Sequence, residues 1–194
     1  MPSLFANMGL ILRTPTQFFS NFKPELVSRR TSIMGIGCLF LGIFFSSVAQ
    51  LYFVHAAKDQ ESVKKLVTPE QLLILKNQSL LELFFSPLTA FFGIILFASA
   101  LHFFIRGLIQ KNQKMASYDT TLSIVSWCQV PMLFCVVPAL GPMVSTVWVF
   151  VLLLKGLKEV YGLSTFAAFI FILTPALFLK MTWSSALQIL ALSL

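Results

Sequence analysis

The chain alternates between long apolar stretches and shorter segments that carry most of its charged residues. The first apolar stretch covers residues 33–54, which are 22 residues without a charge. A helix needs about 20 predominantly apolar residues to cross the hydrocarbon core of a bilayer. Further stretches of this kind lie at about 83–105, 120–137, 143–157 and 161–179. The pattern therefore predicts five transmembrane helices.

The boundary between the third and fourth predicted spans rests on a turn signal. Residues 120–154 are 35 positions without a charge, which is too long for one ordinary span. A strong turn signal stands in the middle of this run, Pro138-Ala139-Leu140-Gly141-Pro142. We therefore expect two spans joined by a turn. In the fifth span, Pro175 is expected to kink or open the helix.

The longest polar connection, residues 55–82, contains the signature of a helix start. In Thr68-Pro69-Glu70-Gln71, the threonine can cap the helix, the proline can take its first position and the glutamine can complete a capping box. Leucines continue the pattern toward the second span. Pro87 is expected to bend or end this helix.

The N-terminal segment, residues 1–32, predicts two short amphipathic helices. Apolar residues recur at helical spacing in its first part, and Thr14-Pro15 indicates a cap and a first helical residue for the second part. Two placements fit this pattern: the helices lie in the membrane interface, or they pack on the protein's own spans. The residues of the apolar faces are Leu4, Met8, Ile11 and Leu12, then Phe18, Phe19 and Phe22.

Composition agrees with a membrane protein. The chain is 57% hydrophobic and only 11% charged, whereas soluble domains carry about 25% charged residues. This composition excludes a soluble domain, a disordered chain and a nucleic-acid binder. We expect an all-α, polytopic helical bundle with an interfacial segment at 1–32, a five-span domain at 33–180 and an apolar tail at 181–194. That tail either lies in the interface or extends the fifth helix.

The distribution of basic residues predicts the orientation in the membrane. With five spans, nine Lys and Arg fall on the side of the N-terminus and five on the other side. The more basic side is expected to be cytoplasmic, which places the C-terminus opposite. The nine should form a collar near anionic headgroups. The candidate lipid contacts within it are Arg29, Arg30, Arg106, Lys111 and Lys114.

The third span carries the densest group of polar residues within an apolar stretch. Ser123, Ser126 and Gln129 lie within seven residues of one another, and His102 of the second span lies one helical turn from Arg106. Hydrocarbon cannot satisfy such groups, so they should point inward. They act either as hydrogen-bonding glue between helices or as a polar crevice for a ligand. For His102, the alternatives are a headgroup or substrate contact and a neutral side chain bonded to a neighbouring helix.

Other residues suggest packing rather than catalysis. Small residues of the first span should allow close helix contact: Gly35, Gly37, Gly42 and Ser46. The three cysteines lie in apolar runs and should be buried, and a metal pair at Cys128 and Cys135 lacks nearby His or carboxylate ligands. The chain contains no metalloprotease, phosphate-loop or nucleophile-elbow motif. We expect no enzyme activity, no cofactor and no metal.

The order of these features resembles the Ypt/Rab-interacting-protein (Yip) domain family. The resemblance rests on Thr14-Pro15-Thr16-Gln17-Phe18-Phe19, on the entry into the third span, and on the exit from the fourth span. That exit leads through Gly156-Leu157 to Tyr161-Gly162. The long hydrophilic N-terminal segment of eukaryotic members is missing, so the chain is similar to the compact bacterial branch. The resemblance implies a five-span bundle in the inner membrane with a role in membrane organisation, trafficking or transport.

Two functions compete at this point. The first is a non-enzymatic adaptor or organiser that engages lipids with anionic headgroups and protein partners, either a second copy or other membrane proteins. The alternative is a small permease or transporter of a lipid or solute that uses the polar face of the third span. Five spans do not divide into two equal halves, which disfavours the transporter.

Overall fold

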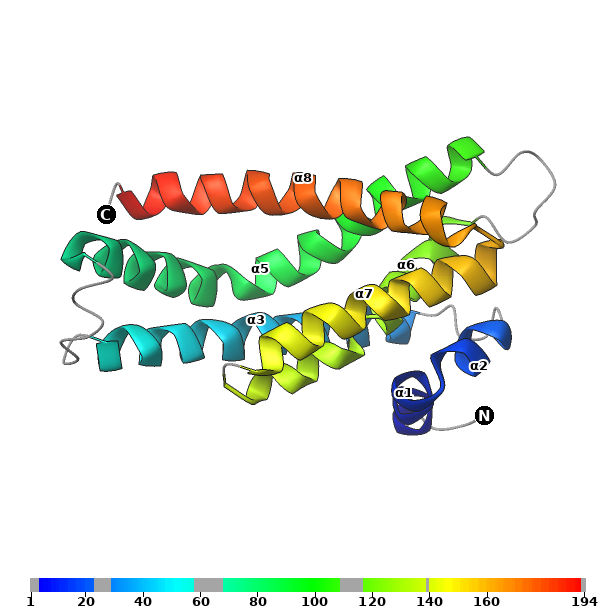
Figure 1. Cartoon of the computed structure of the whole chain (residues 1–194), viewed down its shortest axis with the longest axis horizontal. Helices are drawn as coiled ribbons and strands as arrows, with labels where there is room; N and C mark the ends of the chain where they lie inside the picture. The colour runs from blue at the N-terminus through cyan, green and yellow to red at the C-terminus, as the bar shows by residue number, and fades with distance from the viewer. Residues whose placement is uncertain (1–3, 23–28, 58–67, 109–116, 139, 193–194) are drawn as a thin grey trace.

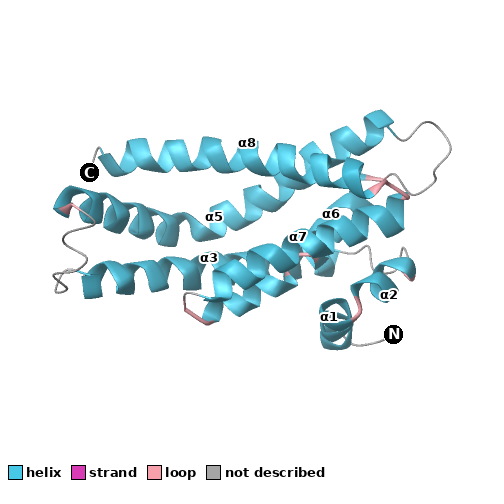
Figure 2. Ribbon diagram, in the orientation of Figure 1, coloured by secondary structure: helices cyan, strands magenta, loops and turns pink. Residues whose placement is uncertain are grey.

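The computed structural model describes residues 4–22, 29–57, 68–108, 117–138 and 140–192. Within these ranges the chain is helical apart from short turns (Figure 2). Five stretches are long and apolar enough to cross a membrane, which confirms the predicted fold class. The elements are α1 (Leu4–Arg13), α2 (Pro15–Ser20), α3 (Arg29–Ala57), α5 (Pro69–Leu108), α6 (Tyr118–Trp127), the 3-10 helix η2 (Val130–Val136), α7 (Leu140–Tyr161) and α8 (Thr165–Leu192).

The three longest helices form the frame of the bundle. α3, α5 and α8 run along its length, with α5 in contact with both of the others (Figure 1). The shorter α6, η2 and α7 form a hairpin that covers only one part of this frame, and α1 and α2 pack at the same end. The N-terminal helices and the C-terminal end of α8 therefore lie at opposite ends of the bundle, as an odd number of spans requires.

The second predicted span is only the second half of a much longer helix. α5 has 40 residues and is about 60 Å long at 1.5 Å per residue. It begins with the predicted capping box: Thr68 N donates to Gln71 Oε1 at 3.0 Å, and Gln71 N donates to Thr68 Oγ1 at 3.3 Å. Of the two expectations for Pro87, a bend or an end, the structure has the bend: α5 continues through it with a change of direction near its middle (Figure 1).

Local chemistry explains why α5 tolerates its proline. Pro87 has no N–H to donate to the carbonyl of Leu83, one turn earlier. The hydroxyl of Ser86 donates to that carbonyl at 2.8 Å instead. The carbonyl keeps a partner, so the helix can bend without ending.

The third span departs further from the expected single helix over 120–137. α6 ends at Trp127, two turn residues follow, and the chain continues as a 3-10 helix to Val136. The change coincides with Pro131, which cannot donate to the carbonyl of Trp127. The N–H of Gln129 bonds the carbonyl of Ser126, three residues back, which is the 3-10 pattern.

The last two spans are longer than expected. α7 covers Leu140–Tyr161 rather than 143–157, and α8 covers Thr165–Leu192 rather than 161–179. The helix α8 continues through Pro175 and includes the tail up to Leu192. Of the two alternatives for the tail, the structure has the extension of the fifth helix. Gly162, with φ of 67°, follows the end of α7 in a conformation that favours glycine.

Two of the three predicted glycines allow close helix contact. A Cβ on Gly35 would lie 2.6 Å from the Cα of Ser126, and one on Gly42 would lie 2.9 Å from the Cβ of Met132. For Gly37, no described residue outside the adjoining part of α3 has a heavy atom within 4 Å of the corresponding position, so the prediction is wrong for this residue. The first span therefore meets the third along one glycine-lined face.

Candidate functional site

A chain of hydrogen bonds links the second, third and fourth spans near the end where α1 and α2 pack. The hydroxyls of Thr121 on α6 and Tyr161 on α7 share a hydrogen bond of 2.7 Å. Thr121 Oγ1 also lies 3.1 Å from His102 Nδ1 on α5. Thr121 and Tyr161 are buried, at 0% and 2% exposure. We call these three residues the polar relay.

The start of α6 positions the relay. Ser117 caps this helix, since its hydroxyl accepts from the N–H of Thr120 at 3.2 Å. The cap fixes the first turn, so Thr121 faces α5 and α7. Tyr118 packs edge-on against the His102 ring, with centroids 5.8 Å apart. His102 is thus bonded to a neighbouring helix, which is the structural alternative predicted for it.

The other residues of the predicted polar face are buried but are not part of the relay. Ser123, Ser126 and Gln129 are exposed by 2%, 0% and 8%. The side-chain amide of Gln129, just after α6, donates back to the carbonyl of Val125 in that helix at 3.3 Å. Because the Gln129 N–H bonds Ser126 instead, this amide serves the carbonyl that the helix break leaves without its usual donor. The hydrogen bond that Gln129 makes is therefore local to the third span rather than between helices.

Ser126 lies where α3 and α6 approach most closely. Its backbone faces Gly35, and its hydroxyl is buried without a hydrogen-bond partner among the described residues. The indole N–H of Trp127 is likewise buried without a hydrogen-bond partner among the described residues. The four polar residues predicted to point inward thus divide into two groups: Ser123, Ser126 and Gln129 lie on a closed packing surface, and His102 is a member of the relay. Tyr161 was not predicted as a site residue, although a tyrosine at the end of an apolar span before glycine is a usable signal.

The aromatic face of α2 packs on the bundle. Phe18 and Phe19 are exposed by only 2% and 1%. The ring of Phe18 lies edge-on to Trp127, with centroids 5.2 Å apart. Thr14 gives α2 no side-chain cap and instead donates to the carbonyl of Leu10 at 3.3 Å. Of the two predicted placements, packing on the protein's own spans holds for α2.

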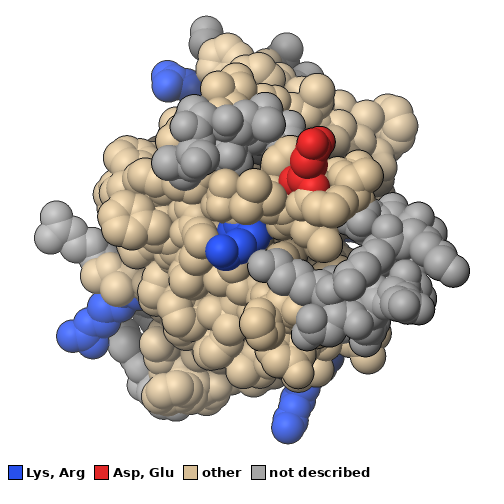
Figure 3. Space-filling view, turned by 90° about the vertical axis from the view of Figure 1, so that its left-hand side faces the viewer, with Lys and Arg blue, Asp and Glu red and all other residues tan. Residues whose placement is uncertain are grey.

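Exposed basic side chains stand on helix ends that lie at the same end of the bundle as α1 and α2 (Figure 1). They come from four elements: Arg13 of α1, Arg30 of α3, Arg106 of α5 and Lys158 of α7. The side chain of Arg29, and all of Lys23, Lys111 and Lys114, lie outside the described residues. Figure 3 looks onto the opposite end, and the charged side chains visible in this view are separated from one another by uncharged surface.

The three cysteines are free and buried, as predicted. Cys135 lies in η2, and its Sγ is 3.5 Å from the hydroxyl of Ser145 on α7. Among the described residues, no three His, Cys, Asp or Glu side chains come together in a group that could hold a metal ion.

Replacing Tyr161 by phenylalanine tests whether the relay stabilises the bundle. The substitution removes one buried interhelical hydrogen bond and keeps the ring. We expect a loss of about 0.6 kcal/mol, and up to about 1.7, in the free energy of unfolding. Unfolding in mixed detergent micelles measures this loss, and Tyr52→Phe is the control because Tyr52 is 76% exposed. Equal stability of Tyr161→Phe and the control would contradict the prediction.

Comparisons with known proteins identify a family whose profile covers nearly the whole chain. No curated protein and no solved structure matches the chain. The profile of one family, described as the Yip1 domain, matches residues 8–187. This match begins within α1 and ends within α8, so it includes the docked aromatic helix, the relay and all five spans. The chain therefore belongs to the Yip1 domain family.

Proposed function

We propose that this integral membrane protein is a non-enzymatic adaptor or organiser that engages lipids and other membrane proteins. The observation that carries the proposal is the length of α5. At about 60 Å it is twice the hydrocarbon thickness of about 30 Å. If Arg106 lies at one headgroup level, Leu73 lies 33 residues away, or about 50 Å along the helix. Its side chain is 57% exposed.

Apolar surface beyond the hydrocarbon core needs a cover other than acyl chains. α3, α5 and α8 extend past the hairpin of α6, η2 and α7 (Figure 1). Their extensions carry exposed apolar side chains, such as Tyr52 at 76% and Ile189 at 70%. Exposed apolar surface that lipid does not cover is typical of protein-binding faces. The cover would be a second copy of the chain or another membrane protein.

The interior supports an adaptor more than the alternative transporter. A transport route along the third span would need its polar face to be open. Ser123, Ser126 and Gln129 are instead buried against neighbouring helices, and Thr121 is bonded to α7. These contacts favour a structural use of the face.

Photo-crosslinking in native membranes tests the adaptor role. A benzophenone amino acid at Leu73 should give discrete protein adducts because this position lies beyond the hydrocarbon core. The same group at Phe92 is the control, since Phe92 is similarly exposed at 53% but lies in the half of α5 that lipid surrounds. Two differently tagged copies would identify self-association. Lipid adducts alone at both positions would contradict the proposal.

We also propose a bacterial inner membrane location with the N-terminus in the cytoplasm. The motivation is the nine-to-five split of basic residues together with the gathering of Arg13, Arg30, Arg106 and Lys158 at one end. Reporter fusions should read cytoplasm at the N-terminus and the opposite side after residue 194. The same reading at both ends would contradict this orientation.

A further inference from the structure

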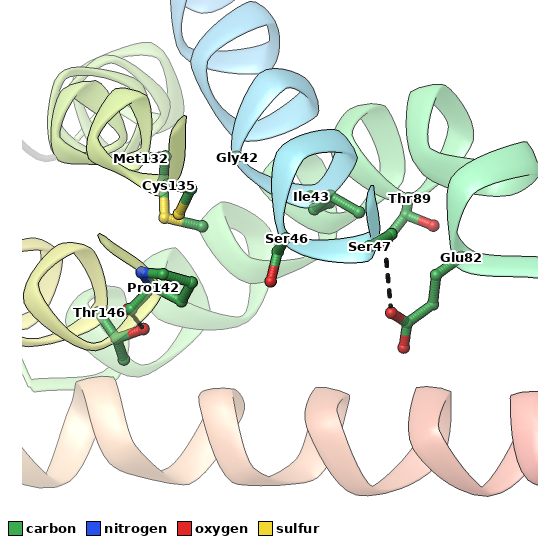
Figure 4. Close-up of a pocket in the computed structure, with 10 residues that line it drawn as sticks. All are labelled: Gly42, Ile43, Ser46, Ser47, Glu82, Thr89, Met132, Cys135, Pro142 and Thr146. Carbon is green, nitrogen blue, oxygen red and sulfur yellow. Dashed lines mark hydrogen bonds between the residues drawn. The ribbon is translucent and has the colours of Figure 1, made fainter. Parts of the chain in front are cut away.

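A cavity of about 240 Å³ lies between α3, α5 and the hairpin of η2 and α7 (Figure 4). It is separate from the polar relay and shares no residue with it. One carboxylate, Glu82 of α5, stands among hydroxyls from three helices: Ser46, Ser47, Thr89 and Thr146. Among the described residues that line the cavity there is no Lys, Arg or His. Its polar lining therefore carries a negative charge without a facing positive one.

The carboxylate of Glu82 keeps hydrogen-bonding capacity for a ligand. Within the described part of the chain, Gln78 donates to it at 3.3 Å and Ser47 at 3.5 Å. Both bonds are long, since charge-assisted bonds are usually about 2.7–2.9 Å. An ionised carboxylate can accept about four hydrogen bonds. In Figure 4, Ser46 and Glu82 point toward the same space above α8, and Thr146 lies across that space beside Pro142.

Two of the hydroxyl groups that line the cavity can only accept hydrogen bonds from a ligand, because each already donates its proton to a carbonyl. Thr89 donates its proton to the carbonyl of Phe85 at 3.0 Å, and Thr146 donates to that of Pro142 at 2.8 Å. The lone pairs of these oxygens stay available. The cavity therefore suits a cation that brings several N–H donors, and it disfavours an anion.

The depth of the cavity indicates where such a cation comes from. Glu82 is 24 residues from Arg106 along α5, or about 36 Å. Ser47 is 17 residues from Arg30 along α3, or about 26 Å. These lengths bracket the hydrocarbon thickness of about 30 Å. If the basic end lies at one headgroup level, the cavity lies at the headgroup border of the other leaflet.

We propose that this cavity binds the primary ammonium group of a lipid headgroup, as in phosphatidylethanolamine. The ammonium brings three N–H donors, which the Glu82 carboxylate and the hydroxyl oxygens of the lining can accept. A choline headgroup has the same charge but no N–H donor. The site goes beyond the proposed adaptor role, because it lies in the opposite leaflet from the basic end and selects the opposite charge.

Lipid retention by the full-length protein tests the proposal. The protein is reconstituted in vesicles with equal amounts of phosphatidylethanolamine, phosphatidylcholine and phosphatidylglycerol of identical acyl chains. The lipids that remain after mild detergent extraction are counted by native mass spectrometry. The wild type should retain the ethanolamine lipid over the choline lipid by about tenfold or more. Glu82→Gln should lose this preference, and Glu70→Gln, on the same helix outside the cavity, should keep it.

Two further variants separate the site from folding and from the proposed function. Ser46→Leu fills the cavity and leaves the carboxylate in place, so it should also lose the preference and decides the matter if Glu82→Gln does not fold. Arg30→Gln combined with Arg106→Gln should lose phosphatidylglycerol and keep the ethanolamine lipid. The experiment therefore distinguishes a loss of anionic lipid at the basic end from a loss of ethanolamine lipid at the cavity.

Three results would overturn the inference. The first is equal retention of ethanolamine and choline lipids by the wild type. The second is an unchanged preference in both Glu82→Gln and Ser46→Leu. The third is displacement of the bound lipid by free ethanolamine at millimolar concentration, which would assign the cavity to a soluble amine instead.

Discussion

Replacing Gly35 by alanine is expected to destabilise the bundle by about 3 kcal/mol, the upper part of the usual range for overpacking. The added Cβ would lie 2.6 Å from both Cα and Cβ of Ser126 and 2.8 Å from its carbonyl oxygen. Two of these atoms belong to the backbone, so rotation of a side chain cannot relieve the clash. α3 and α6 would have to separate, which would disturb the contact between the first and third spans.

Gly37→Ala provides a matched control two residues away in the same helix. Among the described residues, and apart from the adjoining part of α3 itself, no heavy atom lies within 4 Å of a Cβ placed on Gly37. Alanine favours a helix over glycine by about 1 kcal/mol, so this variant should be neutral or slightly more stable. Unfolding in mixed micelles compares the two. Similar stabilities of both variants would mean that α3 and α6 are not in backbone contact at Gly35.

The glycines also show what sequence could and could not predict. A strip of small residues at helical spacing indicates a close contact, and this was correct for Gly35 and Gly42. The strip does not say which of its members faces a partner. That depends on the rotation of α3 against α6 and η2, which is set by the packing of the whole bundle.

The prolines had different outcomes for a local reason. Pro87 is preceded by Ser86, whose hydroxyl serves the carbonyl that proline leaves free, so α5 continues. Pro131 is preceded by Val130, which has no such group, and the chain changes to a 3-10 helix. Serine before proline was a readable signal. The five spans, the capping box and the inward face of α2 depended on periodicity and cap chemistry, which the sequence carries directly.

The site was harder to predict because it depends on contacts between distant residues. Thr121 and Tyr161 are 40 positions apart and meet only when α6 and α7 form a hairpin. Glu82 is at the edge of the predicted second span, and nothing nearby in sequence indicates that hydroxyls from α3 and α7 surround it. Polar residues at span edges can be found from sequence, but their partners require the fold.

Replacing Phe19 by alanine is expected to detach the N-terminal segment from the bundle. Phe19 is 1% exposed, and its ring packs against α7 where Gly156 leaves room for it: a Cβ on Gly156 would lie 3.1 Å from Phe19 Cε1. Truncation of a buried phenylalanine costs about 3–5 kcal/mol. That loss falls on a short segment that packs on the bundle through few fully buried apolar side chains, chiefly Ile11, Phe18, Phe19 and Phe22. Residues 4–22 should therefore open before the spans unfold.

Hydrogen exchange and limited proteolysis measure this opening. Residues 4–22 of Phe19→Ala should exchange faster and be cleaved sooner, while the spans keep their protection. Phe5→Ala is the control, since Phe5 lies on α1 at 80% exposure and contributes little to the packing. Gly156→Ala should loosen the same segment from the other side, because its Cβ crowds the Phe19 ring as well as the side chain of Ile124. Full protection of residues 4–22 in Phe19→Ala would mean that the surrounding lipid, rather than the fourth span, holds the segment in place.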